Sequence, residues 1–184
     1  KGYEKLPDNL LTQVFSTLIT TIPQQRISDK YSLSNGSSSL FLWTVSGVNS
    51  NQIYYQLFDS NNQILLTQNG IRLNQFGQQQ TIKNVILSHG GDYIVIWNDY
   101  NHEENSSDNL SGLKMQIING NTGQFTYEEQ GMLISDETPA YTSANICDEQ
   151  LFIFYYNTSY QIKCQKIVNG QLAWINSKII TSNA

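Results

Sequence analysis

Hydrophobic positions come in short blocks rather than at helical spacing along this chain. Three apolar, aromatic-rich runs stand out: LFLWTV at 40–45, YIVIW at 93–97 and LFIFYY at 151–156. A more polar run precedes each of them. A turn follows, and then come a run of alternating polar and apolar residues and a second polar run. The alternating runs are IYYQLFD at 53–59, LKMQIIN at 113–119 and YQIKCQKIV at 160–168. Because no segment keeps helical periodicity over a useful length, the pattern predicts an all-β chain built from repeats of four short strands.

The spacing of the blocks predicts a repeat architecture. Trp43 and Trp97 stand 54 positions apart, and Phe154 is expected at the equivalent place in the third run. Four-stranded antiparallel blades repeated at about 55 residues are typical of a β-propeller. The predicted division is 1–20 as the last two strands of a preceding blade, and then three blades at 24–74, 79–134 and 138–180. The middle blade has a long loop between its second and third strands. Since closed propellers carry at least four blades, we expect the chain to be a segment of a larger propeller.

Each predicted strand has its own polarity. The second strand of a blade is apolar on both faces and is expected to be buried between neighbouring blades. The third strand alternates, with Gln56 and Gln165 among its polar positions, and is expected to be more exposed than the second. The fourth strand is the most polar and is expected outermost. Asn35-Gly36 and Gly90-Gly91 supply the backbone freedom that hairpin turns need.

These blocks carry motifs that resemble a known group of proteins. The middle unit reads GGDYIVIWND, the first reads IYYQLFDSNNQILLTQNGIRL and the last reads YQIKCQKIVNGQLAWINSKII. They resemble the large secreted β-propeller repeat proteins with blades of the type Q-x-x-P, G-G-x-I-V-V-W-x-D and I-Y-A-Q-x-x-D-x-x-G. The proline of the first motif is present only as Pro139, and the third apolar run ends in tyrosines. The resemblance implies the propeller architecture and leaves the function open, because the matching positions are strand and turn residues.

Charge and composition narrow the classes of function. The net charge of −5 argues against nucleic acid and against anionic membrane as partners. No apolar stretch approaches the length of a membrane span, so no membrane insertion is expected. Four Asn-x-Ser/Thr sequons fall in predicted loops, at Asn35, Asn105, Asn109 and Asn157. They predict an N-glycosylated protein that is extracellular or on the cell surface.

Catalytic constellations are sparse. His89 is expected to be a solvated turn residue, and His102 lies in a polar loop. Arg26 and Arg72 lie in different types of strand, which argues against an arginine cluster. No metalloprotease, phosphate-loop or nucleophile-elbow motif occurs. The sequence therefore predicts a protein that is not an enzyme and that has no cofactor.

Two groups of residues are weaker candidates for a site. The acidic loop offers Asp99, Glu103, Glu104 and Asp108, together with Asn98 and Asn105, as oxygen ligands for Ca²⁺. The second group is aromatic and would suit a sugar-binding surface; it comprises Tyr54, Tyr55, Trp97, Tyr100, Tyr155, Tyr156 and Tyr160. Aromatic residues also fill the cores between sheets, so only Tyr100 and Tyr160, at loop edges, are singled out as contacts.

The two cysteines test the strand order. Cys147 ends a first strand and Cys164 lies in a third strand, with one strand between them. Two strand spacings place them roughly 9–10 Å apart, which is too far for a disulfide. We therefore expect both to be free.

Taken together, the sequence predicts a non-catalytic structural or protein-interaction module of a secreted or cell-surface glycoprotein. Its expected partners are other protein chains, the remaining blades of the same chain, and glycans. Two alternatives remain open: a lectin-like carbohydrate-binding propeller, and a non-catalytic part of a secreted hydrolase.

Overall fold

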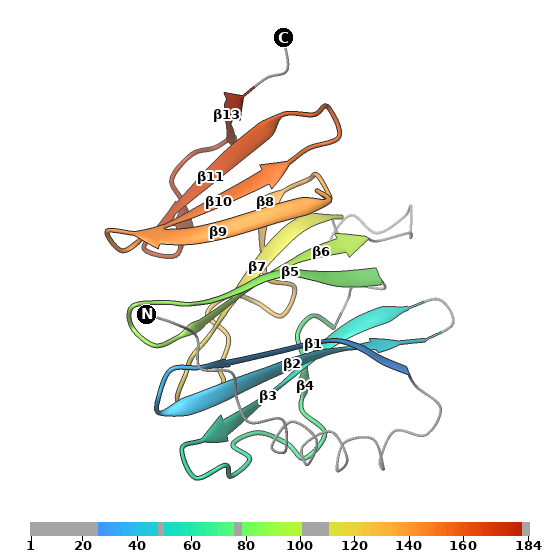
Figure 1. The fold of residues 1–184 in the computed structure, drawn as a ribbon, viewed down its shortest axis with the longest axis vertical. Coiled ribbons are helices and arrows are strands. Elements are labelled where there is room, and N and C mark those ends of the chain that lie inside the picture. The colour runs from blue at the N-terminus through green and yellow to red at the C-terminus, as the bar shows by residue number, and fades with distance from the viewer. Residues whose placement is uncertain (1–25, 48–49, 76–78, 101–110, 182–184) are drawn as a thin grey trace.

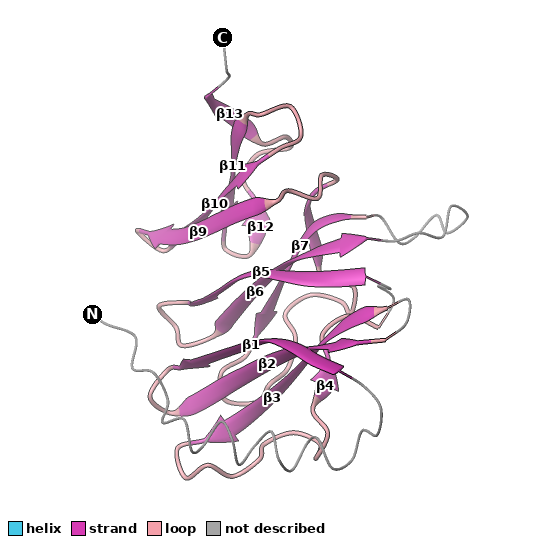
Figure 2. Ribbon diagram, turned by 45° about the vertical axis from the view of Figure 1, so that its right-hand side comes forward, coloured by secondary structure: helices cyan, strands magenta, loops and turns pink. Residues whose placement is uncertain are grey.

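The computed structural model describes residues 26–47, 50–75, 79–100 and 111–181. Strands are the only regular secondary structure within these ranges, so the described part of the chain is all-β, as predicted (Figure 2). Figure 1 shows three groups of strands stacked one above another, from blue at the bottom to red at the top. No helix in this part of the chain is long and apolar enough to cross a membrane. Residues 1–20 and most of the long middle loop lie outside the described residues.

The strands form three units, each running in sequence order. The first unit comprises β1 (Arg26–Ser34), β2 (Ser38–Ser46), β3 (Asn51–Asp59) and β4 (Ile71–Arg72). The second comprises β5 (Gln79–Leu87), β6 (Tyr93–Tyr100), β7 (Gly112–Ile118) and β8 (Met132–Ser135). The third comprises β9 (Tyr141–Cys147), β10 (Gln150–Tyr156), β11 (Ile162–Val168), β12 (Gln171–Leu172) and β13 (Lys178–Thr181).

Pairing within each unit is antiparallel between consecutive strands, which confirms the predicted strand order. The third strand of each unit also pairs with the short strands after it: β3 with β4, β7 with β8, and β11 with both β12 and β13. One parallel bridge between Asn51 and Gln79 joins the first two units, so they share one hydrogen-bonded sheet. The third unit is a separate sheet.

The units pack face to face through the alternating side chains of their second strands. Leu40 and Leu42 of β2 share one buried cluster with Val95 and Trp97 of β6. The opposite face of β6 is buried in a second cluster, which contains strands of the third unit. Because successive side chains of a strand point to opposite faces, β6 serves both clusters. This confirms the predicted burial of β6 on both faces.

The third unit corrects one predicted equivalence. Tyr155 of β10, not Phe154, occupies the position of Trp97, because Tyr155 faces the preceding unit in the second cluster. The register agrees: Trp97 pairs with Lys114 and Tyr155 pairs with Lys163, each two residues before a glutamine. A shift of one residue moves a side chain to the other face of a sheet, so Phe154 points away from the second unit.

A second correction concerns the glutamines of the third strands. Gln56, Gln116 and Gln165 are buried rather than exposed. Each accepts a hydrogen bond at Oε1 from the next backbone N–H, and each donates from Nε2 to a carbonyl of the loop after its strand. Their polar groups therefore tie the loop to the strand, because buried backbone groups must find partners.

Replacing Gln116 by Leu is expected to lower the free energy of unfolding by about 2 kcal/mol. Gln116 Oε1 accepts from the backbone N–H of Ile117 and Tyr127, at 3.0 Å each, and leucine would leave these donors without that acceptor. Chemical denaturation measures the loss. Gln124→Leu, at an exposed position of the same loop, is the matched control and should change the value little. Equal losses in the two variants would contradict the assigned role.

The cysteines agree with their prediction. Cys147 is exposed and free, and Cys164 is buried and free. Burial raises the pKa of the Cys164 thiol, which keeps it protonated at neutral pH.

Candidate functional site

The junction between the first and second units holds a buried ion pair. Asp99 ends the buried part of β6, on the same face as Trp97, and points toward the first unit. Lys114 Nζ on β7 lies 3.2 Å from Asp99 Oδ2, and Asn74 Nδ2, from the residues after β4, donates to the same oxygen at 2.5 Å. Asp99 is 1% exposed and Lys114 4% exposed. Since both charges are withdrawn from water, each depends on the other for compensation.

The junction between the second and third units has a similar arrangement, in which the carboxylate and the amide have changed places. Lys163 Nζ lies 3.1 Å from Glu137 Oε1, and Asn157 Nδ2 donates to the same oxygen at 3.2 Å. At the first junction the carboxylate is on the second strand of the later unit, and the amide comes just after the earlier unit. At the second junction the carboxylate, Glu137, comes just after the earlier unit, and the amide, Asn157, comes just after β10. Both junctions therefore place a lysine, a carboxylate and an amide together.

Arg72 of β4 adds a further positive charge near the first junction. Burial lowers the pKa of Arg72, and attraction to Tyr54 and Asp99 partly offsets that effect. Asp99 Oδ1 accepts no hydrogen bond from the described residues, nor does Glu137 Oε2. Each carboxylate is thus held by a lysine on one oxygen. The two groups of lysine, carboxylate and amide therefore join neighbouring units of the chain.

This environment changes the interpretation of the predicted calcium site. The Asp99 carboxylate already binds Lys114 and Asn74 and lies buried between the first and second units. Glu103, Glu104, Asp108 and Asn105 lie outside the described residues. Asn98, which is also buried, donates its amide to the carbonyl of Pro139 at 2.8 Å. Within the described part of the chain no group of three carboxylate, histidine or cysteine side chains is placed to hold a metal ion.

The opposite ends of the strands carry hydrogen bonds between units. Tyr93 OH donates to the carbonyl of Ser38 at 2.7 Å, and Asn35 Nδ2 donates to the carbonyl of Gly91 at 2.7 Å. Tyr127 OH donates to the carbonyl of Gly170 at 2.7 Å across the second junction. These bonds link turns of successive units.

Tyr127 is expected to make stability depend on pH in the alkaline range. Burial raises the pKa of Tyr127 from 10.0 to about 12 in the folded protein. An acid with a raised folded pKa favours folding fully below its unfolded pKa, so the contribution is lost as pH rises from 10 through about 12. The melting temperature of the wild type, measured by circular dichroism, should therefore fall more steeply over this range than that of Tyr127→Phe. Tyr160→Phe, at an exposed ring, is the control; parallel curves for wild type and Tyr127→Phe would contradict this account.

The structure also bears on the predicted sequons. Asn157 is buried and its Nδ2 donates to Glu137 and Gln161, so a glycan on this nitrogen would break both bonds. Asn35 Nδ2 is engaged with Gly91 in the same manner. The geometry counts against glycosylation at these two positions, while Asn105 and Asn109 lie outside the described residues.

The aromatic candidates divide between the core and the surface. Tyr55, Trp97 and Tyr155 are buried in the clusters between units, and Tyr54 stacks on Trp43 with 6.0 Å between ring centroids. The other members, Tyr100, Tyr156 and Tyr160, lie at the surface end of β6 and around the β10–β11 turn. Tyr160 is 65% exposed and meets Tyr156 edge-on at 5.9 Å. As a group they do not form one surface.

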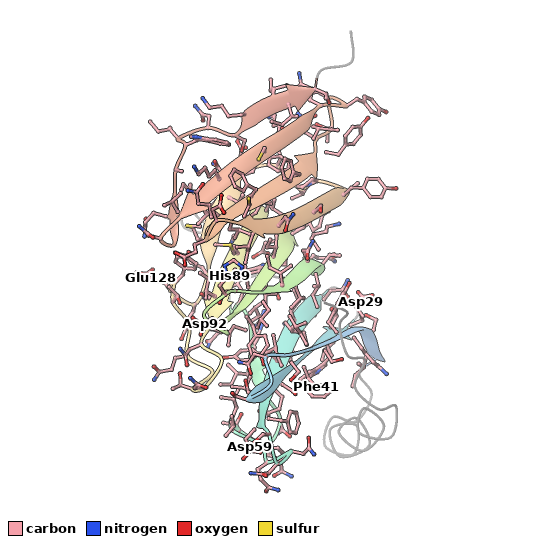
Figure 3. The ribbon with its side chains drawn as sticks, turned by 60° about the vertical axis from the view of Figure 1, so that its left-hand side comes forward. Asp29, Phe41, Asp59, His89, Asp92 and Glu128 are labelled. Atoms are coloured by element: carbon pink, nitrogen blue, oxygen red, sulfur yellow. The ribbon has the colours of Figure 1, made fainter. Side chains whose placement is uncertain are left out.

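His89 lies at the β5–β6 turn and is exposed, as predicted (Figure 3). Sequence reasoning missed the two lysine junctions, although one signal was present. Lys114 and Lys163 each stand two residues before the buried glutamine of their strand. A charged residue repeated at that place in a mostly buried strand indicates a paired charge.

Comparisons with known proteins give only distant likenesses. No protein-family model matches the chain, and no curated protein matches it in sequence. Among solved structures, it is similar to a glycosyl hydrolase from Bacteroides ovatus, with 11% identity and a TM-score of 0.48 over 83% of this chain and 52% of that one. A structure titled for GH130 mannoside phosphorylases and hydrolases acting on β-1,2 mannosidic linkages of Candida mannan has 8% identity and a TM-score of 0.46, over 86% of this chain and 49% of that one.

A Bombyx mori GH32 β-fructofuranosidase has 9% identity and a TM-score of 0.45, over 94% of this chain and 40% of that one. The chain thus spans about half the length of these proteins or less. Similarity at this level assigns neither a family nor an activity.

Proposed function

We propose that the chain is a segment of a β-propeller and acts as a non-catalytic structural or protein-interaction module, with its three units as successive blades. The observation that carries this is the outer face of the third unit. That face is apolar in the manner of the faces that bind the units together, yet within the described residues no strand of a further unit packs against it. A sheet face of this kind is normally buried by a second sheet packed against it.

A comparison of equivalent residues in the three units shows that, in the described part of the chain, the outer face lacks a following unit to bury it. Leu42 of β2 and Ile96 of β6 are fully buried, each under the following unit. Phe154 is at the same place in β10 and is only partly buried. It lines an apolar hollow of about 440 Å³ together with Tyr141, Tyr156 and Ile162. Large apolar surfaces of this kind mark interaction sites.

The partner that fits is another antiparallel sheet of the same kind. The first two units are each covered by a strand that presents alternate large apolar side chains: Tyr93, Val95 and Trp97 over the first unit, and Leu151, Ile153 and Tyr155 over the second. A strand of this type would cover Phe152, Phe154 and Tyr156 in the same way. It would come from a further blade of the protein or from another chain.

The test uses a lysine on the outer face. We expect the wild-type chain to associate reversibly in sedimentation velocity and to bind the apolar dye 1-anilinonaphthalene-8-sulfonate, and Phe154→Lys to lose both properties. Ile175→Lys is the matched control, because Ile175 is 97% exposed and lies in the loop between β12 and β13, so it should behave as wild type. A wild-type chain that stays monomeric and binds no dye would overturn the proposal.

Two further parts of the proposal rest on other residues. An extracellular location is supported by the sequons Asn105 and Asn109. The absence of catalysis is supported by the pairing of Asp99 and Glu137 with lysines, which leaves neither carboxylate free as an acid or base. The carbohydrate-binding alternative is supported by the exposed ring of Tyr160, and a glycan array with wild type and Tyr160→Ala separates it from a protein-binding role.

A further inference from the structure

A hollow of about 270 Å³ lies between the second and third units, and we propose that it is a binding site for a phenolic ring. It is distinct from the outer face of the third unit. Its lining comes from the β5–β6 turn, β6, β7, β9, the β9–β10 turn, β10, β11 and the β11–β12 turn. The residues are Ser88, His89, Gly90, Ile94, Ile117, Ile146, Glu149, Leu151, Ile167, Asn169 and Gly170.

The first junction shows what fills this place elsewhere in the molecule. Tyr93 stands four residues before Trp97, and Leu151 stands four residues before Tyr155, so the two are equivalent. Tyr93 is fully buried, and its hydroxyl reaches the carbonyl of Ser38 in the first unit at 2.7 Å. Leucine has no ring and no hydroxyl. The second junction therefore lacks a phenol at this position of the strand, although Tyr127 reaches across it to the carbonyl of Gly170.

The size and the base of the hollow suit such a ring. An apolar cavity of about 150 Å³ is enough to hold benzene, so this larger hollow can admit a substituted ring. Its base is apolar, formed by Ile94, Ile117, Ile146, Leu151 and Ile167. A sugar ring, with hydroxyl groups around its edge, would leave those groups unpaired against this surface.

The rim provides polar partners for one hydroxyl. His89 stands eight residues before Trp97, as Asn35 stands eight residues before Trp43. Glu149 stands six residues before Tyr155, as Gly91 stands six residues before Trp97. His89 and Glu149 are therefore the counterparts of Asn35 and Gly91 at the first junction. There, Asn35 Nδ2 bonds the carbonyl of Gly91 and closes the turns upon one another. Glu149 has a φ of 62°, a left-handed conformation that glycine adopts freely and that disfavours side chains. In the third unit this position is occupied by Glu149, whose carboxylate side chain lies beside the hollow.

These groups set the orientation of the ligand. The ring lies on the isoleucines and its hydroxyl lies at the rim, where Glu149 accepts a hydrogen bond and His89 donates or accepts one. Figure 3 shows His89 at this junction, below the orange strands of the third unit. The phenol can belong to a free small molecule or to a tyrosine side chain of a polypeptide.

The test is a titration of the folded chain with p-cresol, monitored by two-dimensional ¹H–¹⁵N NMR. We expect saturable binding with a dissociation constant on the order of 1 mM and shifts of the Gly90, Asn169 and Gly170 amides. Leu151→Tyr should bind p-cresol at least about tenfold more weakly and should melt at a higher temperature, because the new ring fills the hollow. Toluene should bind more weakly than p-cresol if the rim groups contribute. N-acetyl-tyrosinamide distinguishes the sources: binding tighter than p-cresol indicates a tyrosine side chain, and weaker binding indicates a free phenol.

Two variants keep this proposal falsifiable. Phe154→Lys changes only the far face of β10 and should bind p-cresol as wild type does, so failure here and failure of the proposed function are separate results. Glu149→Gly installs the residue of the first junction and should weaken p-cresol binding, even if Leu151→Tyr does not fold. Absence of saturable binding to wild type would overturn the proposal, as would equal affinity in wild type, Glu149→Gly and any folded Leu151→Tyr.

Discussion

Replacing Asp99 by Asn is expected to cost about 3–5 kcal/mol of the free energy of unfolding, because removing one member of a buried ion pair leaves the other charge uncompensated. Lys114 is 4% exposed, and its ammonium would remain buried without the carboxylate that lies 3.2 Å away. Asn74 would also lose the anionic acceptor of its amide. The shape of the side chain hardly changes, so the loss reports charge rather than packing. Urea denaturation measures it.

Two further variants define what this loss means. Asp136→Asn removes a carboxylate at an exposed position near the end of β8 and should alter stability by less than about 0.5 kcal/mol. The double variant Asp99→Asn with Lys114→Met removes both charges and should recover much of the loss, since uncharged partners carry no desolvation penalty. A double variant as unstable as the sum of its parts would show that Asp99 and Lys114 do not act as a pair.

Replacing Gly131 by Ala is expected to lower the free energy of unfolding by about 3 kcal/mol through strain and overpacking together. Gly131 has a φ of 72°, where any other residue is strained, and an added Cβ would lie 2.5 Å from Cη2 of Trp97 and 2.8 Å from the carbonyl oxygen of Met115. Trp97 is fully buried between units, so its ring has no free space into which to move. Thermal unfolding monitored by tryptophan fluorescence reports both the stability and the environment of the ring.

The matched control for this prediction is Gly90→Ala. Gly90 has no positive φ, and an added Cβ would meet only Ser88 Oγ, at 3.8 Å. It should change stability by less than about 0.5 kcal/mol. The same contact recurs in the first unit, where a Cβ on Gly70 would lie 2.5 Å from Trp43 Cη2. If Gly131→Ala were as stable as Gly90→Ala, the placement of Trp97 against this turn would be wrong.

The pattern of the sequence predicted much of the fold, because the information it needed was local. Alternation of side chains and the polarity of each run were sufficient to order the strands and to bury β6 on both faces. The pattern failed where a shift of one residue decides to which side of the sheet a side chain points. Phe154 and Tyr155 are adjacent aromatic residues, and only pairing with β11 shows which one faces the second unit.

The sites were harder to predict because their partners lie far apart in the sequence. Asp99 was associated with an acidic loop next to it, whereas it binds Lys114 and Asn74 across a junction. Gln56 and Gln165 were expected in a more exposed strand, since an isolated polar residue gives no sign of a loop that will fold back to it. Asn157 has a perfect sequon, and only the folded structure shows that its amide is enclosed.

Three units stack face to face in the described part of this chain, and no further unit there covers the outer face of the third. Nuclear Overhauser effects between side chains measure this directly in solution. We predict contacts from the Trp97 indole to methyl groups of β2 or β3, and from the Tyr155 ring to methyl groups of β6 or β7. The Phe154 ring should show contacts only within its own unit and with solvent. Contacts from Phe154 to the second unit, or none from Trp97 to the first, would contradict the account.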